Sequence, residues 1–183
     1  VKCGVVDVIQ DMLREDVEFI GSHPMAGKEV SGVEHSDETM FRTANFILTP
    51  TERNTEAGIA FARELAETLE FAHITSLSIQ EHDEMIGFVS QLTHAVAVSL
   101  MNTSDNTHLK DYTGDSFRDL TRIAKINEVL WSELFFLNRK NLVREIEEFV
   151  ASLNDLKEKI DREDEAGVQA LMRQSTRRRR YFD

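Results

Sequence analysis

The spacing of apolar residues divides the chain into two regions of different character. Up to about residue 75, short apolar runs alternate with amphipathic segments. The elements predicted there are a helix around 5–12, strands at VEFIG (17–21), NFILTP (45–50) and FAHITSL (71–77), and a helix at 56–70. This alternation predicts an α/β region.

From Ser78 onward the apolar residues recur at steps of three and four, which is typical of helices. One such face predicts a long helix that ends near Asn102. A polar loop over 102–111 follows, and further helices are expected around 117–124, from 127 to 137 and over 142–160. These helices carry more apolar surface than one small bundle buries, so we expect self-association. A monomeric bundle packed on the α/β region is the alternative.

Composition and charge narrow the class of protein. The 183 residues carry a formal net charge of -12, which disfavours a nucleic-acid-binding surface. No run of about 18 apolar residues is evident, so no membrane span is expected. A single cysteine and the lack of a signal-peptide pattern indicate a cytoplasmic protein. The basic run Arg177–Arg180 is expected to be a frayed, solvated tail, and the start at Val1 suggests a piece of a longer protein.

The stretch GSHPMAGKEVSG (21–32) holds the first candidate for chemistry, His23. It follows the predicted strand VEFIG, and in open α/β sheets ligands bind beyond the carboxyl ends of strands. Pro24 keeps His23 out of helical backbone angles, so the imidazole is presented from a constrained turn. A histidine of ordinary pKa is mostly neutral at pH 7 and can accept a proton. The residues equally allow a structural histidine that caps the turn.

Two more histidines, His82 and His94, lie on or near one predicted helix. A separation of twelve residues corresponds to about 18 Å along a continuous helix and about 120° around it, so both rings cannot reach one small ligand. Either one acts indirectly, or the helix begins after His82, or the two serve different sites in an oligomer. The spacing does not suit a metal site, and none is expected. By itself, His94 on an apolar face is typical of a core histidine.

The stretch SFRDLTRIAKINEVLW (116–131) places Arg118 and Arg122 on one helical face. Arginine is suited to a bidentate grip on a carboxylate. Arg118 is expected to pair with Asp115 or Asp119, whereas Arg122, followed by apolar residues, is expected to point into a partly buried place. Trp131 is typical of a core or a dimer interface.

Together these stretches resemble the prephenate dehydrogenase family, which includes the arogenate dehydrogenases of tyrosine biosynthesis. The initial VK, GSHPMAGKEVSG, LTP, the EHD and SQLTH segments and FRDLTRIAKINEVLW occur in the family's order over about residues 1–145. The resemblance implies a mainly helical fold. Residues 1–75 would be the α/β end of a Rossmann-type nucleotide-binding domain, and residues 76–183 an all-helical domain for substrate binding and dimerisation.

The resemblance also implies an activity and a site. The chain would belong to an enzyme that oxidatively decarboxylates prephenate or arogenate with NAD or NADP, and would be inactive alone. His23 would accept the proton of the substrate's ring hydroxyl. The residues matching substrate-site positions are Glu29, His82, His94, Arg122 and Trp131, with Glu29 in a polar network at the site mouth, Arg122 on a substrate carboxylate and Trp131 reaching across the dimer.

The chain departs from the family pattern at two places. It has no G-x-G-x-x-G run for the cofactor pyrophosphate, so no cofactor-binding residue is assigned. It also has SQLTH where S-H-L-P-H is usual, which places Gln91 at a histidine position. A function of a different class stays open: a non-catalytic helical dimer that binds an aromatic carboxylate as a regulatory or scaffold module.

Overall fold

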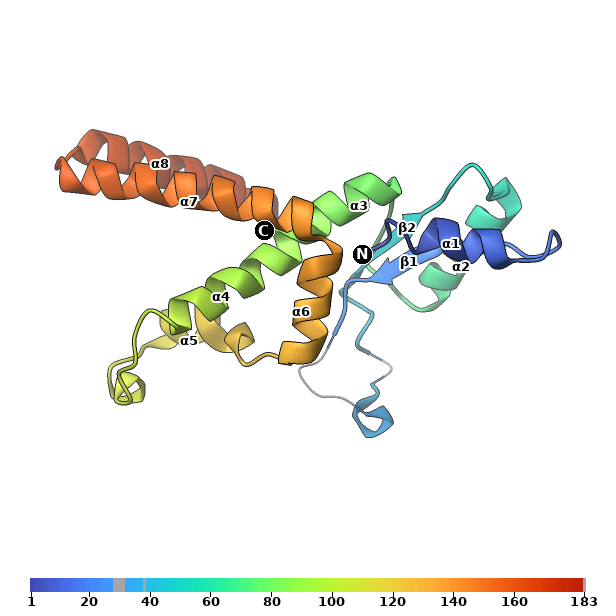
Figure 1. Cartoon of the computed structure of the whole chain (residues 1–183), viewed down its shortest axis with the longest axis horizontal. Helices are drawn as coiled ribbons and strands as arrows, with labels where there is room; N and C mark the ends of the chain where they lie inside the picture. Colours follow the sequence, from blue (N-terminus) through green and yellow to red (C-terminus); the bar gives the residue numbers. More distant parts are fainter. Residues whose placement is uncertain (28–31, 38, 183) are drawn as a thin grey trace. The chain divides into compact units, whose positions relative to one another are not determined.

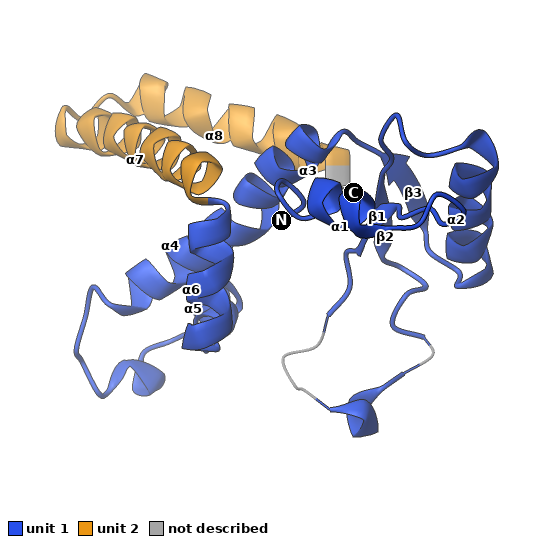
Figure 2. Ribbon diagram, turned by 45° about the vertical axis from the view of Figure 1, so that its right-hand side comes forward, with its two compact units in different colours: residues 1–138 blue, residues 139–183 orange. Residues whose placement is uncertain are grey.

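The computed structural model describes residues 1–27, 32–37 and 39–182. The chain divides into two compact units, Val1–Asn138 and Arg139–Asp183 (Figure 2). Helices predominate, beside one small sheet, in agreement with the mainly helical architecture predicted from the sequence.

The sheet of the first unit has three strands in the order β1-β2-β3. β1 and β2 are labelled in Figure 1, and β3 is labelled in Figure 2. β1 (Gly21–Pro24) runs antiparallel to β2 (Asn45–Thr49), with His23 opposite Ile47. β2 runs parallel to β3 (His73–Ser76), and α2 (Glu56–Thr68) makes the crossover between them, because parallel strands cannot be joined by a tight turn. The central strand β2 is buried from Phe46 to Thr49, as its continuous apolar sequence indicates.

The first strand begins later in the chain than the strand predicted at 17–21. Residues 17–20 are irregular, and β1 begins at Gly21, so His23 lies within a strand rather than beyond its end. Side chains take the place of a strand partner here: the carbonyl of Phe19 accepts hydrogen bonds from Gln10 Nε2 and Asn54 Nδ2. The rule about carboxyl ends of strands therefore does not explain the position of His23.

The core of the α/β part lies between the sheet and its helices. Phe46, Leu48, Ala66 and Phe71 form a buried cluster, and the ring of Phe71 packs on Phe46 with centroids 4.7 Å apart. α1 (Val6–Met12) contributes the buried Val6. This core holds β2, the strand with which β1 pairs.

A long helical run follows the sheet. α3 (Ile79–Ile86), a π-helical segment (Gly87–Leu92) and α4 (Thr93–Met101) form it, and it ends where the sequence predicted. Ser78 begins it with a capping box, in which its hydroxyl accepts from the Glu81 amide and the Glu81 carboxylate accepts from the Ser78 amide. This cap sets the position of the helix turn that follows.

The remaining helices of the first unit are shorter. They are the 3₁₀ turns Val33–His35, Leu109–Asp111 and Arg122–Ala124, and the helices α5 (Asp115–Thr121) and α6 (Glu128–Leu137). Asn127 caps α6 through its side-chain oxygen, as its place before the apolar run predicted. The 3₁₀ turn Leu109–Asp111 lies within the segment predicted to be a loop.

Within the described residues, one helical run, Ile79–Met101, has the length and composition of a possible membrane span, contrary to the expectation from the sequence. Core helices of globular units can have the same length and composition. This run carries the buried polar residues His82, Asp83 and Gln91, and each hydrogen-bonds to another element. These contacts tie the run to β1, to the first residues of the chain and to α6.

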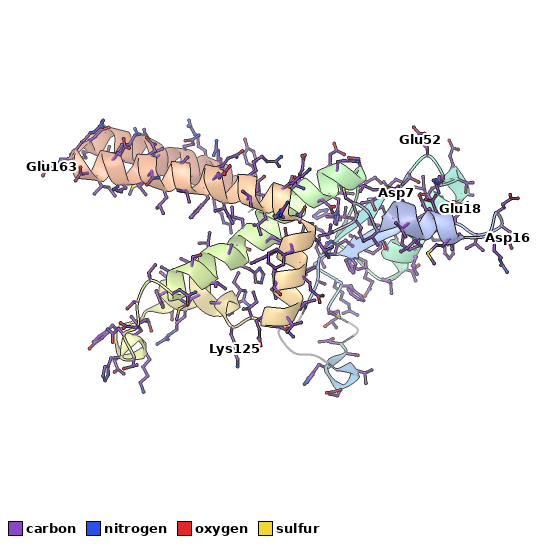
Figure 3. All side chains as sticks on the ribbon, viewed as in Figure 1. Asp7, Asp16, Glu18, Glu52, Lys125 and Glu163 are labelled. Carbon is purple, nitrogen blue, oxygen red and sulfur yellow. The ribbon has the colours of Figure 1, made fainter. Side chains whose placement is uncertain are left out.

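The second unit is a hairpin of α7 (Arg139–Asp161) and α8 (Glu165–Arg179). The chain turns between them at Glu163, whose φ is 55° (Figure 3). Apolar side chains of both helices, including Leu153 and Leu171, line a groove along the hairpin. The basic run Arg177–Arg180 is exposed, as expected, but it is not frayed. α8 continues to Arg179 and a 3₁₀ turn follows over Arg180–Phe182, because arginines are good helix formers and are favoured at a helix C-terminus.

Candidate functional site

Two histidines predicted from different stretches of the sequence meet in the first unit. His23 Nδ1 on β1 lies 2.9 Å from His82 Nε2 on α3, a hydrogen-bond distance. The other ring nitrogen of His82, Nδ1, lies 2.8 Å from Asp83 Oδ1. His82 and Asp83 are fully buried, whereas His23 is partly exposed. The three side chains form one hydrogen-bonded series that leads from the protein interior to His23.

Asp83 is held by backbone groups at the beginning of the chain. Its Oδ1 accepts from the amide of Lys2 at 2.7 Å and its Oδ2 from the amide of Cys3 at 2.8 Å. The Lys2 ammonium donates to the carbonyl of Ser22, beside His23, at 2.5 Å. The segment before α1 is therefore tied both to α3 and to β1.

The electrostatics of this cluster favour a neutral His23 beside an ionised Asp83. Burial, reinforced by the neighbouring His82 and Lys2, lowers the pKa of His23 to about 4. Burial alone would raise the pKa of Asp83, but hydrogen bonds from His82 and from the Cys3 and Lys2 amides outweigh it and hold that pKa well below its usual range. At neutral pH the series therefore has a neutral imidazole at His23 and a carboxylate at Asp83.

A second aromatic cluster lies farther along the helical run. The ring of His94 on α4 stacks on Trp131 of α6, with centroids 3.6 Å apart and planes 28° from parallel. His94 Nδ1 lies 2.9 Å from the carbonyl of Ser90, so a neutral ring donates there and keeps Nε2 as an acceptor. Phe135 meets Trp131 edge to face. This cluster offers a flat aromatic surface with one polar ring edge.

A buried amide pair connects the elements that carry the two clusters. Asn138 Nδ2 donates to the carbonyl of Asp83 and to Gln91 Oε1, both at 2.8 Å. Gln91 Nε2 in turn donates to the carbonyl of Leu134 at 2.9 Å. These bonds join α3, the π-helical segment and α6. Gln91, at a position where the family pattern usually has histidine, therefore has a structural role here.

The structure places the other predicted residues differently. Glu29 lies outside the described residues. Arg118 pairs with Asp115 at 3.7 Å, as expected. Arg122 is exposed, contrary to the expectation of a partly buried side chain, because α5 ends at Thr121 and Arg122 lies in the 3₁₀ turn that follows.

The alternatives for His82 and His94 are narrowed by the helix that carries them. The run begins at Ile79, so the idea that it starts after His82 is wrong. His82 contacts His23 and Asp83, whereas His94 contacts Trp131, so the two rings belong to separate clusters. His82 contacts the predicted proton acceptor, His23, directly.

Sequence reasoning missed Asp83 and Lys2. A signal existed in the pair His82-Asp83 near a helix start, because a carboxylate beside a histidine can fix its tautomer. The contact of Lys2 with Asp83 spans 81 positions and left no trace in the periodicity. Among the described residues no group of three or more His, Cys, Asp or Glu side chains is arranged to hold a metal ion.

Comparisons with known families match both parts of the chain. The family described as "Prephenate dehydrogenase, nucleotide-binding domain" matches residues 1–75, and "Prephenate dehydrogenase, dimerization domain" matches residues 78–174. A prephenate dehydrogenase of Bacillus subtilis (strain 168) is 30% identical over 168 residues, which cover 89% of this chain and 45% of the relative. A cyclohexadienyl dehydrogenase of Zymomonas mobilis is 29% identical over 90% of this chain and 57% of its own length.

Solved structures agree with these matches. The prephenate dehydrogenase of Aquifex aeolicus, in complex with hydroxyphenyl propionate and NAD+, is 34% identical with a TM-score of 0.88, and the match covers 100% of this chain and 65% of that one. The Synechocystis arogenate dehydrogenase shares the fold with a TM-score of 0.84 at 23% identity, over 100% of this chain and 67% of that one. The chain spans about half the length of the curated relatives it matches. The predicted fold class is confirmed, and the chain belongs to the prephenate dehydrogenase family.

Proposed function

We propose that this chain supplies the substrate-binding and dimerisation part of an enzyme that oxidatively decarboxylates prephenate or arogenate with NAD or NADP. The observation that carries the proposal is the neutral, partly buried His23, hydrogen-bonded through Nδ1 to His82. Membership of the family and the matched residue ranges support it. We assign residues 1–75 to the nucleotide-binding domain and residues 76–183 to the helical domain.

His23 would act as the proton acceptor. As the carbon that bears the ring hydroxyl loses a hydride, the hydroxyl loses its proton to His23 and becomes a carbonyl. The C–CO₂⁻ bond then breaks, its electron pair enters the ring, and the carbonyl oxygen regains a proton to become a phenol. Hydroxyphenylpyruvate results from prephenate and tyrosine from arogenate, together with carbon dioxide. His23 thus holds the proton only between the two steps.

Binding of the substrate would raise the pKa of His23, which is low in the free protein. Burial lowers the pKa of His23, which by itself makes the ring a weak base. A bound substrate with one or two carboxylates places negative charge nearby, and negative charge favours the protonated ring. The ring therefore becomes a stronger base when its substrate is bound.

The other substrate contacts are assigned by chemistry. Arg122, exposed after α5, would pair with a substrate carboxylate. The stacked His94 and Trp131 would pack on the substrate ring or its side chain. Glu29, outside the described residues, would join the polar network at the site mouth. Trp131 would reach the substrate across the interface of a homodimer. Formation of this homodimer in the cytoplasm is part of the same proposal.

The nicotinamide supplies the hydride acceptor when bound. The chain contains no glycine-rich run that would bring backbone amides to a pyrophosphate, so its own residues do not fit that part of the cofactor. We therefore assign no cofactor contact to it. What this chain contributes is the proton acceptor and the surface on which the substrate ring rests.

The test uses the full-length protein and its His23→Asn variant in NAD- and NADP-reduction assays with prephenate and with arogenate. We expect turnover to fall by about 10²- to 10⁴-fold with KM little changed, because the loss is confined to proton transfer. His108→Asn, at an exposed histidine, is the matched control and should keep full activity. Absence of reduction by the wild type with either substrate would overturn the proposal and favour a non-catalytic binding module.

A further inference from the structure

We propose that Asp83 is a positioning residue, which acts through His82 to fix the tautomer of His23 and leaves His23 Nε2 as the atom that accepts the substrate proton. This inference rests on the dehydrogenase function proposed above. It assigns a role to a side chain that touches neither substrate nor cofactor in that proposal. The geometry behind it is the continuous series from the Lys2 and Cys3 amides through Asp83 and His82 to His23.

The direction of each hydrogen bond follows from the ionised carboxylate. A carboxylate only accepts, so His82 Nδ1, at 2.8 Å from Asp83 Oδ1, must carry a proton and donate it. A neutral imidazole has one donor and one acceptor nitrogen, so His82 Nε2 then accepts. The nitrogen 2.9 Å away, His23 Nδ1, must be its donor. The lone pair of a neutral His23 is thereby placed on Nε2.

Asp83 is suited to this role because its carboxylate cannot turn. Oδ1 accepts from the Lys2 amide and from His82, and Oδ2 accepts from the Cys3 amide. The backbone carbonyl of the same residue accepts from Asn138. His82 and Asp83 are fully buried, so water does not compete for these bonds.

An opposite arrangement of protons would disable the acceptor. If His82 carried protons on both nitrogens, its Nε2 would donate to His23 Nδ1, and a neutral His23 would carry its proton on Nε2. Among the described residues, the ionisable side chains near this pair are Asp83 of α3 and, from the segment before α1, Lys2 and Cys3. The two arrangements differ in an observable way, namely which nitrogen of His23 is protonated.

The first experiment measures the tautomers directly. Long-range ¹H–¹⁵N spectra of the full-length protein, labelled with ¹⁵N-histidine and recorded at pH 7, show which ring nitrogen carries a proton. We expect protons on Nδ1 of both His23 and His82, with resonances assigned by His23→Asn and His82→Phe variants. A proton on His23 Nε2 in the wild type would overturn the proposal. This readout needs no turnover, so it remains decisive even if the proposed reaction is wrong.

The second experiment removes the charge of Asp83. In Asp83→Asn either orientation of the amide sets an N–H group against the Lys2 or the Cys3 amide, and one orientation donates to His82 Nδ1 and reverses the series. We expect a new His23 species protonated on Nε2 and a fall in kcat of about 10²-fold with KM nearly unchanged. Asp7→Asn is the control, because it removes an exposed carboxylate on α1 (Figure 3) and should change neither.

A double-mutant cycle separates positioning from a merely structural role. If Asp83 acts through His82, then Asp83→Asn should lower kcat far less in a His82→Phe background than in the wild type. Equal fold-changes in both backgrounds would contradict the proposal. Should the Asp83 variant fail to fold, the wild-type tautomers measured in the first experiment still decide the question.

Discussion

Burial and hydrogen bonds together determine the chemistry of the individual residues at the candidate site. His23, His82 and Asp83 are ordinary titratable side chains, but packing against β1, α3 and the first residues of the chain leaves them little water. The pKa of His23 falls to about 4 because its protonated form is poorly solvated. The candidate proton acceptor therefore stays neutral well into the acid range.

This pKa predicts how stability depends on pH. An unfolded histidine titrates near pH 6.5, so between about pH 6.5 and 4 the unfolded chain binds a proton that the folded His23 does not. Acidification through this window should therefore destabilise the fold, by about 1–2 kcal/mol after allowance for the partial exposure of the ring. Asp83 adds nothing in this window, because its lowered pKa leaves it ionised in both states above its unfolded value.

Urea unfolding at pH 7.5 and 4.5 measures this effect. The loss of unfolding free energy between the two pH values should be smaller in His23→Gln than in the wild type, by that same 1–2 kcal/mol. His108→Gln, at an exposed histidine, serves as the control and should follow the wild type. An identical loss in wild type and His23→Gln would show that His23 is not titrated abnormally.

A second residue-scale prediction concerns Gly21, the first residue of β1. A Cβ atom at this position would collide with Thr49 Oγ1, which is fully buried and donates to the Gly21 carbonyl at 3.0 Å. Gly21→Ala should therefore lower the free energy of unfolding by about 1–3 kcal/mol. Gly27→Ala is the matched control, since a Cβ atom added at Gly27 would have nothing within 4 Å. Equal unfolding midpoints for the two variants would contradict the predicted crowding.

At the scale of elements, sequence periodicity predicted the helices whose bounds depend on local apolar spacing and capping residues. The long helical run, α6 with its Asn127 cap and α2 follow from apolar spacing and end signals, so they were predicted close to their observed bounds. The start of β1 was not, because residues 17–20 are apolar but find side-chain partners in Gln10 and Asn54 instead of a strand. Such partners are set by tertiary packing and carry no periodic signal.

The candidate site shows the same division between local and distant information. His23, His94 and Trp131 could be chosen from residue types and from the resemblance. In the structure, His94 and Trp131 stack on each other. Asp83 could not be chosen in this way, because the role proposed for it depends on backbone amides 80 and 81 positions away. Exposure of Arg122 likewise depends on where α5 ends, which spacing does not resolve.

The amide pair Gln91–Asn138 gives the element-scale prediction. Asn138→Ala removes the donor to two buried acceptors, the Asp83 carbonyl and Gln91 Oε1. We expect a loss of about 2–4 kcal/mol in unfolding free energy, since each buried acceptor left unpaired costs about 1–3 kcal/mol. Asn154→Ala, at an exposed position of α7, is the control and should change it by less than about 0.5 kcal/mol. A loss as small as that of the control would mean that the pair does not hold α3 and α6 together.

At the scale of the whole molecule, apolar side chains remain uncovered on α6. Val129, Leu130, Phe136 and Leu137 are exposed, Phe136 by 75% and Leu137 by 63%. No residue of α6 is buried, although Val129, Leu130, Trp131 and the run Leu134–Leu137 make most of its sequence apolar. Exposed apolar surface of this extent is typical of an interface between proteins, and the match to a dimerisation domain supports a second copy as the partner.

This surface predicts an oligomeric state that one substitution can change. Sedimentation equilibrium of the full-length protein should give a dimer, and Phe136→Glu should shift it toward monomer, because a charge buried in an apolar interface is strongly unfavourable. Tyr112→Glu places the same charge at another exposed aromatic residue, 74% accessible, and should leave the dimer intact. If Phe136→Glu also lowers kcat and not only the association constant, the site is completed across the interface, as proposed for Trp131. A folded Phe136→Glu protein that remains fully dimeric would instead place the interface on other helices.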